Sequence, residues 1–300
     1  MTMAEASPLR AAAWMMGALI SFSTMAVATR EISAELDTFQ LMFYRSAIGL
    51  VLIGSIVLAT ARGRSRLRTS KLPLHLTRNL VHFVGQFGWF YAIALIPFVQ
   101  VIALEFTTPL WVALLAPLFL REKLTWNRLA AAILGFAGVM LVLRPGVETV
   151  NTGTIAILIG AMGFAGSIMC TKRLSATDAP LTILFYMVVI QMPVAAAVAI
   201  GTGEFVLPTP RGWVFAVIVA VCGMTAHFSI ARALSHADVI VVAPLDFLRL
   251  PLMAVVGFLL YAEGLELWVL AGGGLILLAN YANIALESRA VPPRAVVSRD

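Results

Sequence analysis

Charge is scarce in this sequence of 300 residues. Asp, Glu, Lys and Arg together make up 12% of it, whereas apolar residues make up 61%. An ordinary soluble domain carries about twice that share of charge, and a single soluble core stops growing at about 250–300 residues. Water is therefore a poor solvent for this chain, and the shortage of charge indicates a protein that lies in lipid.

The residues and motifs of many enzymes are also missing. The two cysteines, Cys170 and Cys222, lie inside apolar runs, and we interpret them as small buried residues without a disulfide or metal role. The four histidines form no His-Glu-x-x-His motif, and neither Gly-x-Ser-x-Gly nor an Asp-rich metal motif occurs. A Gly-x-x-x-x-Gly-Lys segment for the phosphates of ATP is absent as well. We therefore expect no metal, no cofactor and no enzymatic activity, and we do not expect ATP to be the direct energy source.

Apolar runs of about 20 residues, the length of a helix that crosses a bilayer, are abundant instead. Ten such runs can be distinguished, and the short loops between them leave no room for an inserted soluble domain. The runs cover residues 11–29, 39–60, 76–96, 100–120, 127–144, 153–171, 180–200, 212–233, 239–260 and 265–286. We predict an all-α integral membrane protein with ten transmembrane helices.

Basic residues alternate between successive loops. With the N-terminus in the cytoplasm, the cytoplasmic loops and tails hold fifteen Lys and Arg residues and the outer loops hold three. Cytoplasmic loops carry this excess in membrane proteins, so we predict an inner-membrane protein whose tails, residues 1–10 and 287–300, are both cytoplasmic. The net charge of +6 is spread over these short loops, which argues against a nucleic-acid partner.

The chain resembles itself at an offset of about 141 residues. The matches in register are Phe43-Tyr44 with Phe185-Tyr186, Glu105 with Asp246, and Glu122 with Glu263. Each half, residues 11–144 and 153–286, would then hold five helices, and an odd number forces the halves to insert with opposite orientation. Such inverted repeats are typical of secondary transporters, whose substrate site lies near the membrane midplane between the halves. The alternative is chance similarity between two apolar sequences.

Three motifs of the first half carry a family resemblance. They are a proline-containing segment from Pro109 to Ala113, the Leu-x-Glu-x-Leu turn from Leu120 to Leu124, and Gly135-Phe136-Ala137-Gly138-Val139. In these the chain resembles the drug/metabolite transporter superfamily, in its ten-helix EamA-type branch, over essentially residues 11–286. The second copy is less regular, with Tyr261 to Leu265 and then Gly272-Gly273-Gly274, and Arg121 and Ala262 stand where the family usually has a glycine.

Two further stretches narrow this resemblance. Phe43-Tyr44-Arg45 and the stretch from Arg78 to Tyr91 are similar to uptake members of the family that carry riboflavin or S-adenosylmethionine. The glutamates of the repeated turn, Glu122 and Glu263, are expected to cap or orient the next helix near its positive N-terminus. The glycines are expected to let helix backbones approach closely.

Five charged residues lie within the predicted spans: Arg45, Arg78, Glu105, Asp246 and Arg249. A charge at the bilayer centre costs about 2.5–3.5 kcal/mol on insertion scales, so such residues pair, reach an interface or face a wet cavity. Asp246 and Arg249, three residues apart, are candidates for one ion pair, and Glu105 is expected to pair with Arg45 or Arg78. Prolines near both acids can break their helices. Glu105 or Asp246 is also a candidate to bind a coupling proton.

The third predicted span carries a polar stripe. His75, Arg78, His82 and Gln86 are spaced by three or four residues and share one helix face, and Trp89 lies near its continuation. We interpret His75 and Arg78 as residues that reach toward the interface. The deeper His82 and Gln86 are expected to line a substrate cavity or, alternatively, to bond to neighbouring helices.

Other polar and aromatic residues are weaker candidates for the same cavity. The polar ones are Trp14, Thr24, His227, Asn280 and Asn283, and the alternative for each is helix-packing contact. The aromatic ones, which could stack on a planar ring, are Tyr44, Trp89, Phe90, Tyr91 and Trp111.

These patterns predict a secondary active transporter that moves a small metabolite by alternating access. Riboflavin, or a similar ringed vitamin, is the substrate we expect for uptake, and export of amino acids or other metabolites is the alternative. An intramembrane enzyme and a membrane sensor or scaffold are alternatives of another class. The expected partners are a small-molecule substrate and lipid, with proton coupling, a monomer and a homodimer all left open.

Overall fold

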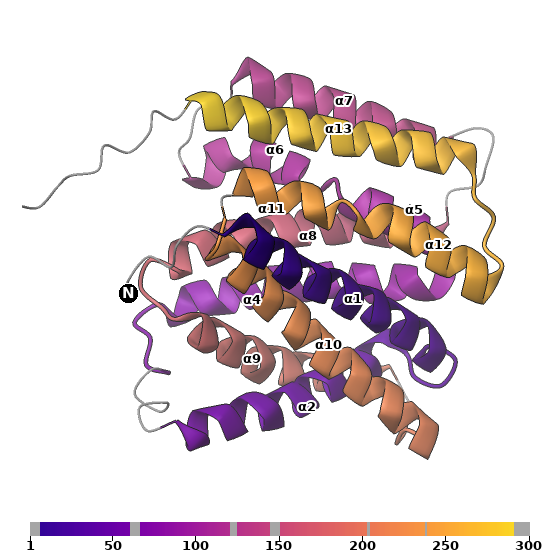
Figure 1. Cartoon of the computed structure of the whole chain (residues 1–300). Helices are drawn as coiled ribbons and strands as arrows, with labels where there is room; N and C mark the ends of the chain where they lie inside the picture. The colour runs from indigo at the N-terminus through magenta and orange to yellow at the C-terminus, as the bar shows by residue number, and fades with distance from the viewer. Residues whose placement is uncertain are drawn as a thin grey trace, which may run out of the picture.

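The computed structural model describes residues 7–60, 67–120, 125–144, 151–202, 205–237 and 239–290. Within these residues every regular element is a helix (Figure 1). The helices are α1 (Pro8–Ile32), α2 (Thr38–Ala59), α4 (Leu72–Leu95), α5 (Phe98–Glu105), α6 (Thr108–Leu120), α7 (Trp126–Leu143), α8 (Thr152–Leu174), α9 (Pro180–Gly201), α10 (Pro210–Leu234), α11 (Val239–Asp246), α12 (Arg249–Tyr261) and α13 (Leu267–Ala290).

The expected ten membrane spans are recovered, two of them as broken helices. Nine stretches of the described chain are long and apolar enough to cross a membrane. Helix α4, with 24 residues, matches them in length, but its polar stripe lowers its hydropathy. The fourth span consists of α5 and α6, and the ninth consists of α11 and α12. The all-helical, ten-span prediction is therefore confirmed.

Both breaks fall at the same place in the repeat. Helix α5 ends at Glu105 and α6 begins at Thr108, whereas α11 ends at Asp246 and α12 begins at Arg249, each 141 residues later. Pro109 suits the first turn of α6, because a proline there removes an amide that would lack a helical partner anyway. The expected helix breaks are confirmed. Each leaves backbone carbonyls and a carboxylate at a helix end inside the bundle.

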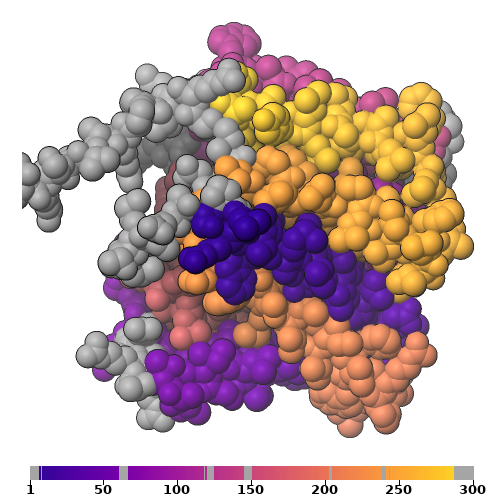
Figure 2. All heavy atoms as spheres, in the orientation of Figure 1, coloured from indigo at the N-terminus to yellow at the C-terminus, as the bar shows by residue number. Residues whose placement is uncertain are grey.

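Packing between helices follows a two-fold pattern. Helix α1 packs on α10 and its repeat equivalent α8 packs on α4, while α2 packs on α9 and α7 packs on α13. Figure 2 shows α1 as a band lying between α10 and the chain of α11 and α12. Because equivalent helices exchange partners in this way, the centre of the bundle is made by both halves.

Glycines allow the closest helix contacts, as expected. A Cβ atom on Gly138 of α7 would lie 2.6 Å from the carbonyl oxygen of Gly272 on α13. A Cβ atom on Gly163 of α8 would lie 2.6 Å from the carbonyl oxygen of Val81 on α4. Side chains at these positions would push the helix pairs apart, so the glycines of the family motif serve packing.

The two ends of the bundle can be distinguished by the helix termini and helix junctions that lie there. At one end α1 begins and α13 ends; we call this the terminal end (Figure 1). The opposite end holds the start of α2, the junction of α4 with α5, and the junction of α12 with α13. Residues 1–6 and 291–300, which make up most of the two predicted tails, lie outside the described residues.

Candidate substrate site

An ion-pair network lies where the two broken spans meet. Arg249 Nη1, at the start of α12, donates to Glu105 Oε1 and Oε2 over 3.0 and 3.1 Å, and its Nη2 donates to Asp246 Oδ2 over 3.3 Å. Trp89 Nε1 on α4 donates to Glu105 Oε2 over 2.8 Å. The side chains of Arg249 and Glu105 are 5% and 16% exposed. The network therefore joins the two halves of the repeat inside the bundle.

This geometry confirms one expected pair and corrects another. Asp246 and Arg249 form the ion pair that their spacing suggested. Glu105 pairs with Arg249, so the prediction that it would pair with Arg45 or Arg78 is wrong. The reason is tertiary: α5 packs directly on α12, and the two helix breaks bring the end of α5 to the start of α12.

Aromatic rings enclose the shared arginine. The Arg249 guanidinium carbon lies 4.8 Å from the ring centre of Phe22 and 5.0 Å from that of Phe106. Phe106 in turn meets Phe247 edge to face at 5.4 Å. Arginine stacks readily on aromatic faces, so these rings fix the guanidinium while excluding water from it.

A second polar cluster lies deeper along the stripe of α4. In the amide orientation that satisfies its neighbours, the Gln86 oxygen accepts from Arg45 Nη1 at 2.6 Å and from Nη2 at 3.0 Å, and its nitrogen donates to Gln191 Oε1 at 2.6 Å. Gln191 Nε2 on α9 donates to His82 Nδ1 over 3.1 Å and to the carbonyl oxygen of Asn79 over 3.1 Å. Helices α2, α4 and α9 thus supply a connected set of buried polar groups.

The lower half of the stripe does not reach an interface as expected. Arg78 is 7% exposed and donates to Asn79 Oδ1 at 2.7 Å and to Thr171 Oγ1 at 3.3 Å. His75 is fully buried. Arg78 finds its partners on α4 and α8, and His75 finds one in the loop after α8, so neither side chain extends toward water and our interpretation of them was wrong.

His75 closes the terminal end of the bundle. Its Nε2 lies 2.6 Å from Asp178 Oδ2, in the loop between α8 and α9, and Thr69 Oγ1 donates to the same oxygen over 2.6 Å. Burial alone would raise the pKa of Asp178, but the hydrogen bonds from Thr69 and His75 outweigh it and lower that pKa below its ordinary value. The first and second halves are tied together here.

Glu263 plays the corresponding part at the opposite end. It pairs with Arg30 at 3.0 Å and accepts a hydrogen bond from the backbone amide of Phe98 at 2.8 Å. Phe98 is the first residue of α5, so Glu263 caps a helix of the other half. The prediction that it would cap the next helix in the chain, α13, is wrong. Tertiary packing places the carboxylate at the N-terminus of α5, where the helix dipole stabilises a negative charge as it would at the N-terminus of α13. Glu122 lies outside the described residues.

The structure brings some of the remaining candidates to the centre and leaves others away from it. His227 lies 6.4 Å from His82 and 5.7 Å from Phe22 between ring centres. Asn280 donates to the carbonyl oxygen of Phe106, at the break between α5 and α6, over 2.6 Å. Asn283 is buried one turn further on. In contrast, Trp14 packs against Phe228 and Arg232, and Thr24 is exposed.

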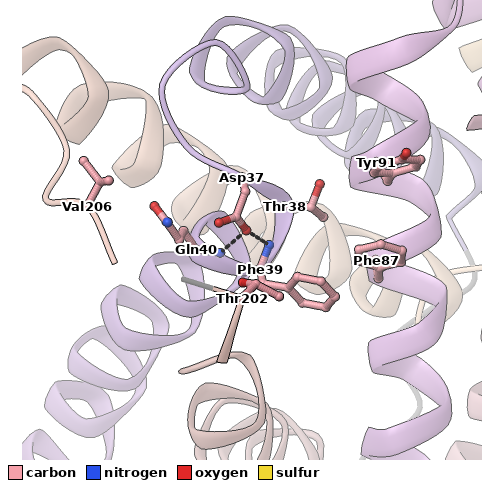
Figure 3. A pocket seen from close by; sticks show the side chains of 8 residues that line it. All are labelled: Asp37, Thr38, Phe39, Gln40, Phe87, Tyr91, Thr202 and Val206. Atoms are coloured by element: carbon pink, nitrogen blue, oxygen red, sulfur yellow. Dashed lines mark hydrogen bonds between the residues drawn. The ribbon is translucent and has the colours of Figure 1, made fainter. Parts of the chain in front are cut away.

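A cavity of about 730 Å³ opens at the end of the bundle opposite the termini. Figure 3 shows its lining, which comes from the start of α2, the last turns of α4 and the segment after α9. The lining residues are Asp37, Thr38, Phe39, Gln40, Phe87, Tyr91, Thr202 and Val206. The position of the cavity suits the entry of a ligand, since Gln86 and Arg45 lie further along the same two helices.

Three rings of the cavity form a nearly parallel stack. Phe39 and Phe87 have ring centres 4.7 Å apart and planes at 19°, and Phe87 and Tyr91 have centres 5.4 Å apart and planes at 18°. The ring of Phe83 is also nearly parallel to that of Phe39, with ring centres 6.2 Å apart. Figure 3 shows the Phe39 ring pointing toward Phe87. Such faces suit a planar ring; of the five aromatic candidates, Tyr91 is the one that lines this cavity.

Sequence reasoning missed several members of the site. Gln191 is a single polar residue in the otherwise apolar middle of α9, and that isolation was a usable signal for a buried partner. Asn79 was overlooked because it sits beside Arg78 and off the counted stripe. Phe39 and Phe87 gave no signal, because phenylalanine is common in any membrane span.

The comparisons with known proteins agree with this architecture. The model of the EamA-like transporter family matches residues 9–144 and 151–284. A riboflavin transporter of Brucella anthropi is 29% identical over 272 residues, which are 89% of this chain and 95% of that protein. An S-adenosylmethionine uptake transporter of Rickettsia felis is 26% identical over 280 residues, covering 93% of each. A pseudopaline exporter of Pseudomonas aeruginosa is 28% identical over 88% of this chain and 92% of its own.

A crystal structure of a protein 20% identical in sequence shares the fold, with a TM-score of 0.62 over 94% of this chain and 99% of that one. The family match covers both halves of the repeat, and relatives similar over nearly their whole length are transporters of small metabolites. The chain therefore belongs to the EamA-like transporter family and is a multi-pass membrane protein that transports small metabolites.

Proposed function

We propose that this protein is a secondary active transporter that imports a small ringed metabolite across the inner membrane, with riboflavin as the first substrate to test. The stacked rings of Phe39, Phe87 and Tyr91 in the cavity between α2 and α4 carry the proposal. A volume of about 730 Å³ lies within the range of about 300–1,000 Å³ that holds drug-sized ligands. The name of the Brucella relative supports riboflavin.

Alternating access would use the ties at the two ends of the bundle as gates. Arg30 with Glu263 joins the halves at one end, and His75 with Asp178 joins them at the other. Inverted repeats rock against each other around a central site, so each tie would break in turn while the other holds. The breaks in the fourth and ninth spans would then offer polar backbone groups to that site.

Coupling to a proton would run through the acids of the central network. Glu105 and Asp246 share the single guanidinium of Arg249. Among the described residues Asp246 Oδ1 has no hydrogen-bond partner. Two acids thus face one arginine inside the bundle, and buried acids in membrane spans often mark proton pathways, which supports a proton as the coupling ion.

S-adenosylmethionine is the second candidate, because the Rickettsia felis relative is an uptake transporter of that compound. Its adenine is also a planar ring that would suit the stack. It differs from riboflavin in carrying a carboxylate and a positive charge.

Transport by the purified full-length protein in liposomes tests the proposal. We expect saturable uptake of a labelled ringed metabolite, riboflavin or S-adenosylmethionine, that an imposed inward proton gradient accelerates. Phe87→Leu should raise KM about 5- to 10-fold through loss of ring stacking. Phe258→Leu, which changes a ring on the exposed face of α12, should transport normally. An unchanged KM in the Phe87→Leu variant, or no uptake of any ringed compound, would contradict the proposal.

A further inference from the structure

Two arginines buried in the spans have no carboxylate partner in the part of the chain that the structure describes. Arg45 and Arg78 are 5% and 7% exposed, and among the described residues neither forms a salt bridge within 4.0 Å. Arg249, buried to the same degree, has both Glu105 and Asp246. Removing a charge from water is costly unless a counter-charge offsets it. The site near Arg45 and Arg78 therefore favours an anion that the described residues do not supply.

The donors of Arg45 are only partly used. Nη1 and Nη2 both point at the single neutral oxygen of Gln86. Nε has no hydrogen-bond partner among the described residues. A guanidinium presents paired N–H groups that match the two oxygens of a carboxylate. The single oxygen of the Gln86 amide therefore accepts hydrogen bonds that the two oxygens of a carboxylate would accept with better geometry.

The surroundings of Arg45 hold it in place. A Cβ atom on Gly223 of α10 would lie 3.2 Å from Arg45 Nη2, so the missing side chain there gives the guanidinium its room. The ring of Phe90 lies 5.9 Å from the guanidinium carbon. These neighbours are neutral, and they fix the orientation of the charge without pairing with it.

The cavity of Figure 3 is lined by the same two helices that carry this arginine and its partner Gln86. Gln40, which lines the cavity, precedes Arg45 by five residues on α2, and Phe87, which also lines it, follows Gln86 directly on α4. A planar ring stacked against these aromatic side chains would therefore lie on the same two helices as Arg45 and Gln86.

We propose that Arg45 is the binding residue for a carboxylate of the transported metabolite, and that Arg78 adds a second positive charge to the same field. The inference rests on the proposed function and narrows its substrate class to ringed compounds with a carboxylate. The carboxylate accepts hydrogen bonds from Nε and from a terminal nitrogen that now donates to Gln86. Of the two candidates, S-adenosylmethionine fits this description, and riboflavin has no carboxylate.

Equilibrium binding to the purified full-length protein in detergent tests the inference without requiring transport. The probes are S-adenosylmethionine and its decarboxylated analogue, which differ only in the carboxylate. We expect the wild-type protein to bind the first about 10- to 100-fold more tightly, in line with a charge-assisted bidentate contact. Equal affinity for the two probes would overturn the inference.

Substitutions assign the preference to Arg45. Arg45→Gln should abolish the preference for the carboxylate-bearing probe. Arg45→Lys keeps the positive charge but loses the paired N–H donors of the guanidinium, so it should retain part of the preference. Arg211→Gln removes an exposed arginine with a side chain 76% exposed and should leave the preference intact. A preference that survives Arg45→Gln would overturn the inference. Binding of riboflavin alone would also overturn it while leaving the proposed function standing, and binding of no ringed compound would contradict both.

Discussion

Replacing Glu105 with glutamine should destabilise the protein through the central network. The carboxylate accepts hydrogen bonds from Trp89 and twice from Arg249, at 2.8 to 3.1 Å. The change leaves Arg249, with a side chain only 5% exposed, with Asp246 alone at 3.3 Å. Removing one partner of a buried pair costs about 3–5 kcal/mol. Because Asp246 and the new amide oxygen still compensate in part, we expect a loss of about 2–3 kcal/mol for Glu105→Gln.

Unfolding by SDS in mixed micelles, followed by tryptophan fluorescence, measures this cost. The control is Glu266→Gln, which breaks an ion pair nearer the surface. In that pair the side chain of Arg144 is 22% exposed and that of Glu266 is 48% exposed. Surface pairs contribute about 0–1 kcal/mol, so the control should lose no more than that. A double-mutant cycle with Arg249→Met should give a coupling energy of about 1–3 kcal/mol. Additive costs, or a loss no larger than that of the control, would refute the reasoning.

Three further predictions follow from other parts of the structure. Asn280→Leu removes the hydrogen bond to the Phe106 carbonyl oxygen at the helix break and should cost about 1–3 kcal/mol in the same unfolding assay; an unchanged midpoint would contradict the assigned role. Gly138→Leu should cost about 1–3 kcal/mol by forcing α7 from α13, and a stable variant with unaltered helix packing would refute the close approach. The pKa of Asp178 is lowered in the folded state, so its stabilising contribution is present above its ordinary pKa and is lost as pH falls through the folded value. The melting temperatures of wild type and Asp178→Asn should therefore converge below about pH 4, and a gap independent of pH would contradict this account.

The helical spans were predictable because lipid imposes a simple rule on sequence. Each backbone polar group must bond within its own helix, so runs such as residues 180–200 are legible without tertiary information. The breaks at Glu105 and Asp246 were also predictable, since proline and the repeat point to the same two places. The ends of the helices were less so: α1 runs from Pro8 to Ile32 where apolarity alone gave residues 11–29.

The partners of the buried polar groups were not predictable, because they depend on which helices meet. The choice of Arg249 for Glu105 is made by the packing of α5 on α12. The cap that Glu263 places on α5 crosses between the halves and leaves no trace in local sequence. The stack of Phe39 on Phe87 likewise joins two helices whose sequences give no hint of each other. Periodicity shows which face of a helix is special, and tertiary structure decides what that face meets.

Cross-linking of one gate tests the central claim of alternating access most directly. In a background with Cys170→Ser and Cys222→Ser, the paired variant His75→Cys with Asp178→Cys puts one thiol on each side of the tie in which His75 Nε2 now lies 2.6 Å from Asp178 Oδ2. A short reducible bifunctional linker should then stop uptake of the labelled ringed substrate into liposomes, and reduction should restore it, whereas either single-cysteine variant should be unaffected. Transport at an undiminished rate through the linked protein would contradict the account.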